Sequence, residues 1–272
     1  MKLLLFRHLW GVDEPWETFF PKAKKAGYHG IETWVPEPKE RGRFRKLLRQ
    51  NGLSFLAYIG TGGSSVEEHA RSFEQALETA RGMEPLAVNA HSGRDAFSLD
   101  ESRAFFERAL AAESSSGLRV SHETHRGRIL YNPWTTSALV DEFPELKLNY
   151  DLSHWVCVAE RLLDTEGAIL KKCAKRCVHI HARVGYEEGP QVPDPRAPEY
   201  AGHLKKHEDW WDEAWRAQKA LGRDHVTLTP EFGPPWYLHT LPYTQVPVAD
   251  LHDICEWQAQ RQARRFKKLF GA

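Results

Sequence analysis

Eight short apolar runs alternate with eight helix-like segments along the 272 residues of the chain, and this alternation predicts a single-domain (β/α)8 barrel over residues 1–272. The length agrees, because such barrels take about 250 residues. From residue 120 onward, an acidic or imidazole side chain stands at the end of four successive runs. Barrel enzymes keep their chemistry at this carboxyl-terminal end of the strands. Together the three observations favour a closed barrel over an open sheet.

Each run expected to form a strand is short, largely apolar, and bounded by Gly, Pro or polar turn residues. In chain order the expected strands are Leu3–Trp10, Gly30–Val35, Ser54–Gly60, Leu86–His91, Arg119–His125, Lys147–Asp151, Cys177–Arg183 and His225–Glu231. The expected helices are Glu14–Gly27, Pro38–Asn51, Ser65–Arg81, Asp100–Gly117, Pro133–Phe143, Val158–Ala174, Lys205–Gly222 and Ala249–Phe270. Ser65 and Asp100 suit helix starts, and the glycines at 27, 52, 117 and 222 suit left-handed helix stops.

The composition is that of a globular enzyme rather than of a nucleic-acid or membrane protein. Lys and Arg number 37, as do Asp and Glu, so the formal net charge is zero and no overall field attracts polyanions. The apolar start Leu3–Phe6 is too short for a signal sequence, and no run reaches membrane-spanning length. The four cysteines lack the paired spacing of a zinc site, which favours reduced thiols and a cytoplasmic location. The oligomeric state is left open, a homo-oligomer included.

One segment interrupts the alternation of strands and helices. Gly185–His203 carries four prolines and shows no helical periodicity. Long loops inside compact domains are usually functional or disordered. Because this loop follows the seventh expected strand, it should lie at the mouth of the barrel, where a lid or substrate-specificity loop is favoured over a passive linker.

Four side chains at successive strand ends form a candidate metal site. They are Glu123, Asp151, His181 and Glu231. If each run is a parallel strand, all four converge at the same mouth. Burying them costs several kcal/mol unless they are paired or hold a cation. Any single one could be a hydrogen-bonded core residue, but the whole set favours one divalent ion: Mn²⁺, Mg²⁺ or Co²⁺, with Zn²⁺ also compatible.

Other polar residues near the strand ends are candidates for substrate binding. Alternate side chains of a barrel strand point inward, so His179 and Arg183 share the inward face of His181. Glu32 could orient a ligand or a substrate hydroxyl, or form a buried pair with a loop cation. His91 is either a hydrogen-bonding pocket residue or a structural one.

Two tryptophans also lie at strand ends. Trp10 and Trp34 stand at or just past the first and second expected strands. Sugar sites often have aromatic walls, so both residues are candidates for substrate binding. Core packing explains either one equally well.

These residues carry a family resemblance. The motifs Gly27-Tyr-His-Gly-Ile-Glu32, Asp151-Leu-Ser-His154, His179-Ile-His181 and Pro230-Glu231, with the strand ending at Glu123, resemble the xylose isomerase-like barrel superfamily. The resemblance implies that Glu123, Asp151, His181 and Glu231 are the metal ligands. It also implies that His154 contacts a substrate oxygen. The implied activity is a metal-dependent isomerase or epimerase acting on a sugar or small polyhydroxy carbonyl compound through a cis-enediolate, with Glu123 and Glu231 exchanging the proton.

Departures from the family patterns leave alternatives open. Ketose 3-epimerases have a glutamate where this chain has Ile129 and an arginine where it has Glu187. A metal-dependent lyase or dehydratase acting on a keto-sugar or inosose would use the same enolate. An endonuclease IV-like abasic-site nuclease is less favoured, because Arg196 follows Asp194 where that motif needs a histidine. A non-catalytic sugar-binding barrel is the remaining class.

Overall fold

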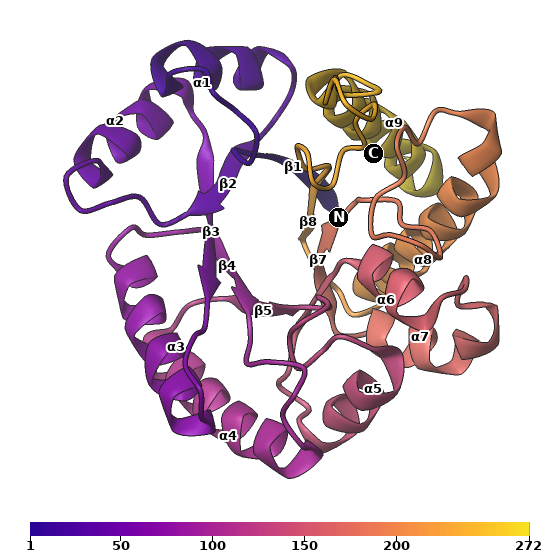
Figure 1. Ribbon diagram of the computed structural model, residues 1–272. Helices are drawn as coiled ribbons and strands as arrows, with labels where there is room; N and C mark the ends of the chain where they lie inside the picture. Colours follow the sequence, from indigo (N-terminus) through magenta and orange to yellow (C-terminus); the bar gives the residue numbers. More distant parts are fainter. Residues whose placement is uncertain (272) are drawn as a thin grey trace.

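The computed structural model describes residues 1–271 and confirms the (β/α)8 barrel. Eight parallel strands close in sequence order, with β8 paired to β1 (Figure 1). The strands are β1 (Lys2–His8), β2 (Gly30–Trp34), β3 (Ser54–Gly60), β4 (Ala87–His91), β5 (Val120–Glu123), β6 (Leu148–Tyr150), β7 (Cys177–His181) and β8 (His225–Thr229). Because all strands run in the same direction, their carboxyl ends open at one mouth.

Helices cover the outside of the barrel (Figure 1). They are α1 (Trp16–Lys25), α2 (Arg41–Asn51), α3 (Val66–Arg81), α4 (Leu99–Ser116), α5 (Pro133–Glu142), α6 (Leu152–Ala159), α7 (Gly167–Ala174), α8 (Ala201–Ala220) and α9 (Leu251–Phe270), with 3-10 turns η1 (Asp164–Glu166) and η2 (Pro198–Tyr200). Ser65 caps α3 as expected, whereas Ser98 rather than Asp100 caps α4. No helix within residues 1–271 combines the length and apolar character needed to cross a membrane.

The apolar core lies between the barrel wall and the helices. The rings of Phe20 (α1) and Phe55 (β3) both pack edge-on against Phe44 (α2), at centroid distances of 5.6 and 5.1 Å. Trp215 of α8 meets Phe266 of α9 at 5.3 Å. Each buried side chain of this size contributes about 1.5–3 kcal/mol. The outer layer can therefore stabilise the fold while the barrel interior carries polar groups.

The barrel interior is polar at the level just below the mouth. In the strand register, Asn89 pairs with Ser121 and Glu123 pairs with Asn149. On the other side of the barrel His179 pairs with Thr227. Buried polar side chains need partners. The amide nitrogens of Asn89 and Asn149 donate to Glu123, and His179 bonds to Thr227, whereas Oδ1 of Asn89 and Oδ1 of Asn149 have no hydrogen-bond partner.

Some predicted boundaries are wrong. The single helix expected over Val158–Ala174 is instead α6 and α7, because Glu160 adopts a left-handed conformation (φ 51°) that ends α6. Helix α8 begins at Ala201 rather than Lys205. Several strands end earlier than expected, so Asp151 and Glu231 lie in the loops just past β6 and β8. Asp151 thereby occupies the N-cap position of α6.

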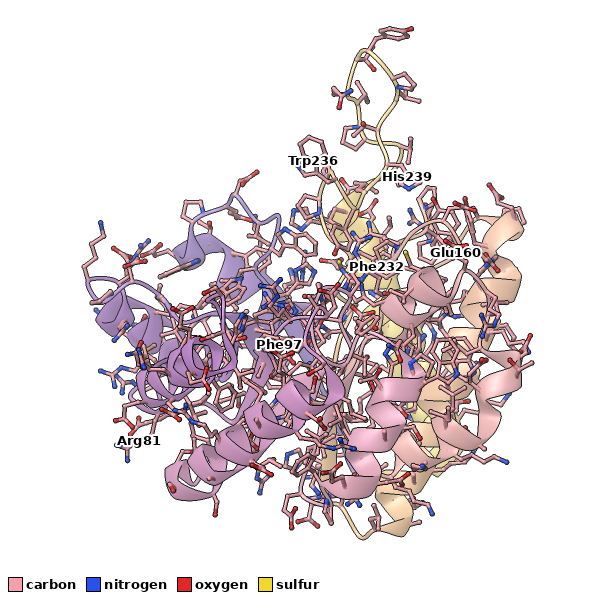
Figure 2. All side chains as sticks on the ribbon, turned by 60° about the horizontal axis from the view of Figure 1, so that its bottom comes forward. Arg81, Phe97, Glu160, Phe232, Trp236 and His239 are labelled. Atoms are coloured by element: carbon pink, nitrogen blue, oxygen red, sulfur yellow. The ribbon has the colours of Figure 1, made fainter. Side chains whose placement is uncertain are left out.

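The segment Gly185–His203 is packed rather than free-standing. Gln191 and Val192 are buried, and Gln191 exchanges two hydrogen bonds with the backbone of Gly233, at 2.7 and 3.1 Å. His203 belongs to α8. The role of this segment as a lid or substrate-specificity loop stays a prediction. The more exposed part of the mouth is the connection from β8 to α9, residues 230–250, which rises above the barrel (Figure 2) and was not singled out from the sequence.

All four cysteines are free, in agreement with the expectation of reduced thiols. Cys173, Cys177 and Cys255 are buried, and burial raises the pKa of each of these thiols. A thiol with a raised pKa is a poor nucleophile and a poor metal ligand. These three buried cysteines are therefore packing residues.

Candidate metal centre

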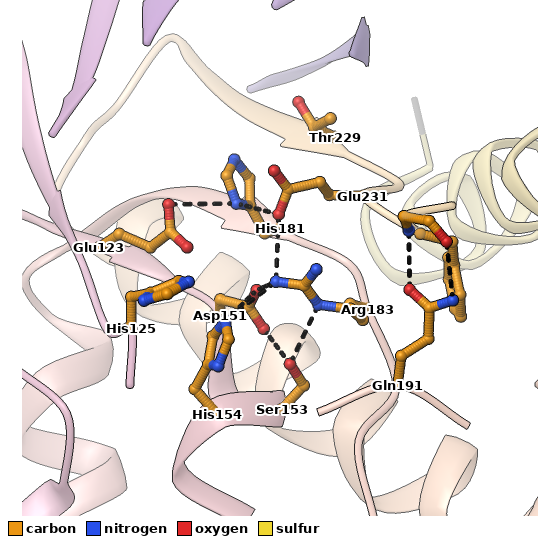
Figure 3. Close-up of polar contacts among 12 residues, drawn as sticks. Glu123, His125, Asp151, Ser153, His154, His181, Arg183, Gln191, Thr229 and Glu231 are labelled. Carbon is orange, nitrogen blue, oxygen red and sulfur yellow. Dashed lines mark hydrogen bonds and ion pairs between the residues drawn. The ribbon is translucent and has the colours of Figure 1, made fainter. Parts of the chain in front are cut away.

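The four candidate ligands lie together at the mouth of the barrel (Figure 3). They come from the ends of four neighbouring strands: Glu123 (β5), Asp151 (after β6), His181 (β7) and Glu231 (after β8). One ligand atom from each side chain lies within 4.8 Å of the others, and all four residues are buried. The order of the strands around the barrel brings these groups together, as the sequence analysis expects.

One carboxylate oxygen of Glu123 is crowded with donors. Its Oε2 accepts hydrogen bonds from Nδ2 of Asn89 (2.6 Å) and from the Tyr58 hydroxyl (3.1 Å), and it lies 3.2 Å from Nε2 of His91. Its Oε1 is buried and has no hydrogen-bond partner. Burial alone would raise the pKa of Glu123, but the imidazoles of His91 and His181 hold it well below its usual range.

Glu32 holds the imidazole of His181 from across the barrel. Nε2 of His181 donates to Oε1 of Glu32 at 3.0 Å, and Nε2 of His179 donates to Oε2 at 3.3 Å. Burial would raise the pKa of Glu32, but His181 and His179 hold it far below the usual value. The other ring nitrogen, Nδ1 of His181, lies 2.8 Å from Oε2 of Glu231 without the alignment of a hydrogen bond.

Arg183 is the counter-ion of Asp151 (Figure 3). Its Nη2 pairs with Asp151 and lies 3.3 Å from Oε2 of Glu231. The same nitrogen donates to Nε2 of His154 at 3.0 Å, and Nε donates to the hydroxyl of Ser153 at 3.3 Å. Burial and the neighbouring carboxylates raise the pKa of Asp151 to about 6, against the opposing charge of Arg183.

The donor set fits a divalent cation. Buried polar atoms normally find partners, yet Oε1 of Glu123 and Nδ1 of His181 have none, and both belong to the four-residue cluster. Three carboxylates and one imidazole form an oxygen-rich set that suits Mn²⁺, Mg²⁺ or Co²⁺ and is compatible with Zn²⁺. A second group, His91, Glu123 and His125, is equally close, but the Tyr58 hydroxyl already occupies Nε2 of His91.

A cavity of about 370 Å³ opens beside the cluster. Of the residues expected to line a substrate pocket, Trp10, Trp34, Glu32, His91 and Arg183 do so. The other two expected pocket residues do not: His154 is fully buried against Arg183, and His179 lies lower in the barrel, bonded to Glu32. A larger cavity of about 640 Å³ lies at the opposite end of the barrel, and none of the four candidate ligands lines it.

A family profile described as xylose isomerase-like TIM barrel matches residues 20–192, which is more than half of the chain. The chain belongs to this family. Glu123, Asp151 and His181 lie within the matched residues, and Glu231 lies beyond them. No curated protein sequence matches the chain.

Solved structures share the xylose isomerase-like fold over nearly the whole chain. The probable 3-DHS dehydratase AsbF of petrobactin synthesis from Bacillus anthracis is 16% identical, with a TM-score of 0.61 and coverage of 97% of this chain and 100% of that one. The 3-keto-D-glucoside 4-epimerase from E. coli is 12% identical, with a TM-score of 0.60 and the same coverage. A family 2 AP endonuclease from Brucella melitensis is 14% identical, with a TM-score of 0.59 and coverage of 95% and 98%. Identities this low show a shared fold and not a shared reaction.

Sequence reasoning missed several residues of this xylose isomerase-like site. Tyr58 and Asn89 bind Glu123, Ser153 binds Asp151 and Arg183, and Tyr237 lines the cavity. Asn89 could have been found, because it stands two residues before His91 and so shares its inward face. No local pattern marks Tyr237, which belongs to the long connection after β8.

Proposed function

We propose that the chain is a divalent-metal-dependent isomerase or epimerase acting on a sugar or another small polyhydroxy carbonyl compound. The observation that carries the proposal is the buried cluster whose four ligand atoms lie within 4.8 Å of one another. Family membership supports it. Glu123, Asp151, His181 and Glu231 would hold the cation, which when bound would supply Lewis-acid polarisation of a substrate carbonyl.

The two glutamates provide the proton transfer in this proposal. Glu231 lines the cavity and removes the proton next to the substrate carbonyl, which leaves a cis-enediolate. Glu231 keeps the proton that it removed, and Glu123, which must enter this step protonated, donates its own proton at the neighbouring carbon or on the opposite face. Exchange with solvent then restores both carboxyl groups. Glu123 lies behind Tyr58 and His91, which line the cavity and contact its Oε2. Donors crowd Oε2, and the imidazoles of His91 and His181 hold the pKa of Glu123 well below its usual range, so Glu123 gives up a proton readily.

Arg183 and two tryptophans would hold the substrate. Nη1 of Arg183 is buried and has no partner, while the residue lines the cavity, so this nitrogen is free to donate to a substrate oxygen. Trp10 and Trp34 give the cavity aromatic walls for the C–H faces of a sugar. His154 acts through Arg183, whose guanidinium it helps to position.

A dehydratase is the second candidate. Removal of the same proton gives an enolate that can expel a hydroxyl group from the next carbon. The fold resembles that of a probable 3-DHS dehydratase, and dehydration is therefore one of the reactions to be tested. In that case Glu231 is again the base, and a protonated neighbour must supply a proton to the departing hydroxyl.

The first test is metal content. Chain purified without chelator should carry about one divalent ion by elemental analysis, the stoichiometry of a single catalytic site. Asp151→Ala should lose that ion, because a buried ligand and its charge are removed. Asp141→Ala, on the exposed face of α5 and paired with Lys172, is the matched control and should keep it. Full occupancy in Asp151→Ala would overturn the assignment of the site.

The second test separates the reaction classes. The metal-loaded chain is incubated in deuterated water with a panel of ketoses, keto acids and inososes. An isomerase or epimerase incorporates solvent deuterium without loss of water, whereas a dehydratase eliminates water from the substrate, so that its product is lighter by one water. A sugar-binding barrel would show thermal stabilisation by a panel member with no exchange, and that result would contradict the enzymatic proposal.

A further inference from the structure

Residues 234–248 of the connection between β8 and α9 form an arm that rises beyond the mouth of the barrel (Figure 2). The arm contains no Asp, Glu, Lys or Arg, although these residues make up 27% of the chain. Its sequence is instead rich in proline, aromatic and aliphatic residues. An uncharged projection of this kind has no electrostatic attraction for nucleic acid or for an anionic membrane.

The arm is an ordered hairpin. Backbone hydrogen bonds run from Val248 N to His239 O (3.0 Å) and from Leu241 N to Val246 O (2.8 Å). An isolated antiparallel bridge joins Thr240 to Pro247 between them. The tip is thus held by its own backbone.

The base of the arm is anchored to the barrel. The ring of Tyr237 packs edge-on against Trp10 at 4.9 Å and lies 4.8 Å from the guanidinium carbon of Arg183. Leu238 is buried. Gly233, just before the arm, accepts a hydrogen bond from Nε2 of Gln191 and donates one to its Oε1. The base is thus tied to the barrel, and the hairpin extends from it beyond the mouth (Figure 2).

The apolar surface of the arm is large. Trp236 and Tyr243 are fully exposed, and Leu241, Val246 and Val248 are about half exposed. The two rings alone represent about 400 Å² of surface per arm. Two such arms, counted with the surfaces they would cover, exceed the roughly 1,200 Å² at which specific protein interfaces begin. An exposed apolar surface of about 400 Å² is comparable to the largest apolar patch of a typical monomeric protein, and such patches often mark an interaction site.

A receiving surface lies on the same face of the chain. Trp10 and Trp34 line the cavity at the mouth and remain 40% and 55% exposed. A two-fold interface requires that one chain carry both the projecting surface and the surface that receives it. We propose that the arm seats on the mouth of a second copy of this chain, so that each copy of a dimer covers the cavity of the other.

The partner's arm would complete the site in this arrangement. It shields the aromatic rim and helps to exclude water from the cavity, which a reaction through an enediolate requires. This consequence rests on the proposed function. Dimer formation itself does not, and it is measured without metal or substrate, so the two ideas can fail separately.

The first experiment measures the mass of the full chain in solution by light scattering after size exclusion. The native chain should be a dimer, and the double variant Leu241→Lys, Tyr243→Lys should have half that mass, because two charges would have to be buried at the interface. Leu221→Lys is the matched control: this residue is 57% exposed and lies at the opposite end of the barrel, just before β8, so the dimer should persist. A monomeric native chain, or a dimer in the double variant, would overturn the proposal.

The second experiment tells a second copy from a lid. Chains carrying Tyr243→Cys are mixed with chains carrying Trp34→Cys and treated with a short bis-maleimide, which alkylates one thiol at each end. A cross-linked pair containing one chain of each kind is expected. A chain that carries both Tyr243→Cys and Trp34→Cys tests the alternative, in which the arm closes over its own cavity. A cross-link formed only within one chain would show that the arm does not seat on the mouth of a partner. The absence of any cross-link in a chain shown to be a dimer would show the same.

Discussion

Glu32 decides which nitrogen of His181 faces the candidate metal centre. Nε2 of His181 donates its proton to Glu32, so Nδ1 is the nitrogen that faces Glu231 and Glu123. Carboxylates that bind the outer nitrogen of a ligating histidine fix its tautomer and its orientation. Glu32 therefore acts on the site as a positioning residue through His181.

Replacing Glu32 by Gln should weaken cation binding by about 10–100-fold, because the neutral amide no longer fixes the imidazole or raises its basicity. Equilibrium dialysis with Mn²⁺ measures the affinity directly. The matched control is Thr227→Val, since the Thr227 hydroxyl bonds to His179 and to the backbone oxygen of Val178 in the same interior layer but to none of the four candidate ligands. If the native chain binds Mn²⁺ and Glu32→Gln binds it equally tightly, Glu32 does not position His181 for cation binding.

The protonation of the cluster predicts a pH dependence. Burial and the neighbouring carboxylates raise the pKa of Asp151 to about 6. Burial would lower the pKa of His181, but Glu231, Glu32 and Glu123 raise it well above its usual value. In the cation-free chain both groups therefore hold protons in weak acid, and a cation must displace them.

Cation binding should accordingly weaken as the pH falls through about 6. The stability of the cation-free chain depends on pH in the opposite direction. The pKa of Asp151 in the folded state lies above its usual value of 3.8, so folding is favoured by the protonation of this group. This contribution to the stability is full below about pH 4 and is lost as the pH rises through about 6. Thermal unfolding with and without Mn²⁺ checks both statements. The stabilisation by Mn²⁺ should be larger at pH 7.5 than at pH 5, and an equal shift would contradict the prediction.

At the scale of elements, the early start of α6 builds one wall of the site. The helix begins immediately after Asp151, so its first turn brings Ser153 and His154 against Arg183 from the end of β7. Gly185 allows this approach. A Cβ on Gly185 would lie 2.6 Å from the backbone oxygen of Ser153 and 2.7 Å from its Cα.

Gly185→Ala should therefore displace the first turn of α6 and destabilise the chain by about 1–3 kcal/mol, the usual cost of overpacking. It should also weaken cation binding, because Asp151 precedes that turn. Gly202→Ala is the control, since no atom lies within 4 Å of its Cβ in α8, where alanine favours the helix by up to about 1 kcal/mol. Urea unfolding compares the two variants, and equal stabilities would show that α6 tolerates the shift.

At the scale of the whole molecule, the charge balance argues against a role on DNA. The formal net charge is zero, and Arg196, where a nuclease histidine would stand, is paired with Asp194 at 2.7 Å. Duplex binding requires a basic surface that neutralises several phosphates. The fold likeness to a family 2 AP endonuclease therefore carries less weight than the chemistry of the mouth.

The chain should leave a labelled abasic duplex intact and should not bind it tightly at moderate salt. Gel separation of the labelled strand measures incision, and fluorescence anisotropy measures binding. Asp151→Ala serves as the control for contaminating nucleases. Incision that the native chain catalyses efficiently and Asp151→Ala does not would overturn the isomerase proposal.

The amino-acid sequence by itself determined the barrel and the order of the four candidate ligands. Both depend on local properties: apolar runs of strand length, helix punctuation, and polar residues at the ends of runs. Glu123, Asp151, His181 and Glu231 could be grouped without coordinates because parallel strands that close into a barrel must end at one mouth. The boundary errors, such as the helix expected across Glu160, arise where one residue leaves the helical conformation without a Gly or Pro to mark it.

Only the tertiary structure decided which polar groups are partners. Glu32 contacts His181 from the opposite side of the barrel. Tyr58 contacts Glu123, although two helices separate these residues in the sequence. These contacts depend on barrel closure and on side-chain conformations that no local pattern encodes. The direction of the arm at residues 234–248 is of the same kind, because it depends on Tyr237 packing against Trp10 and on Gln191 holding Gly233. The local sequence pattern therefore predicts where the functional side chains lie, and long-range packing determines which contacts hold each of them in place.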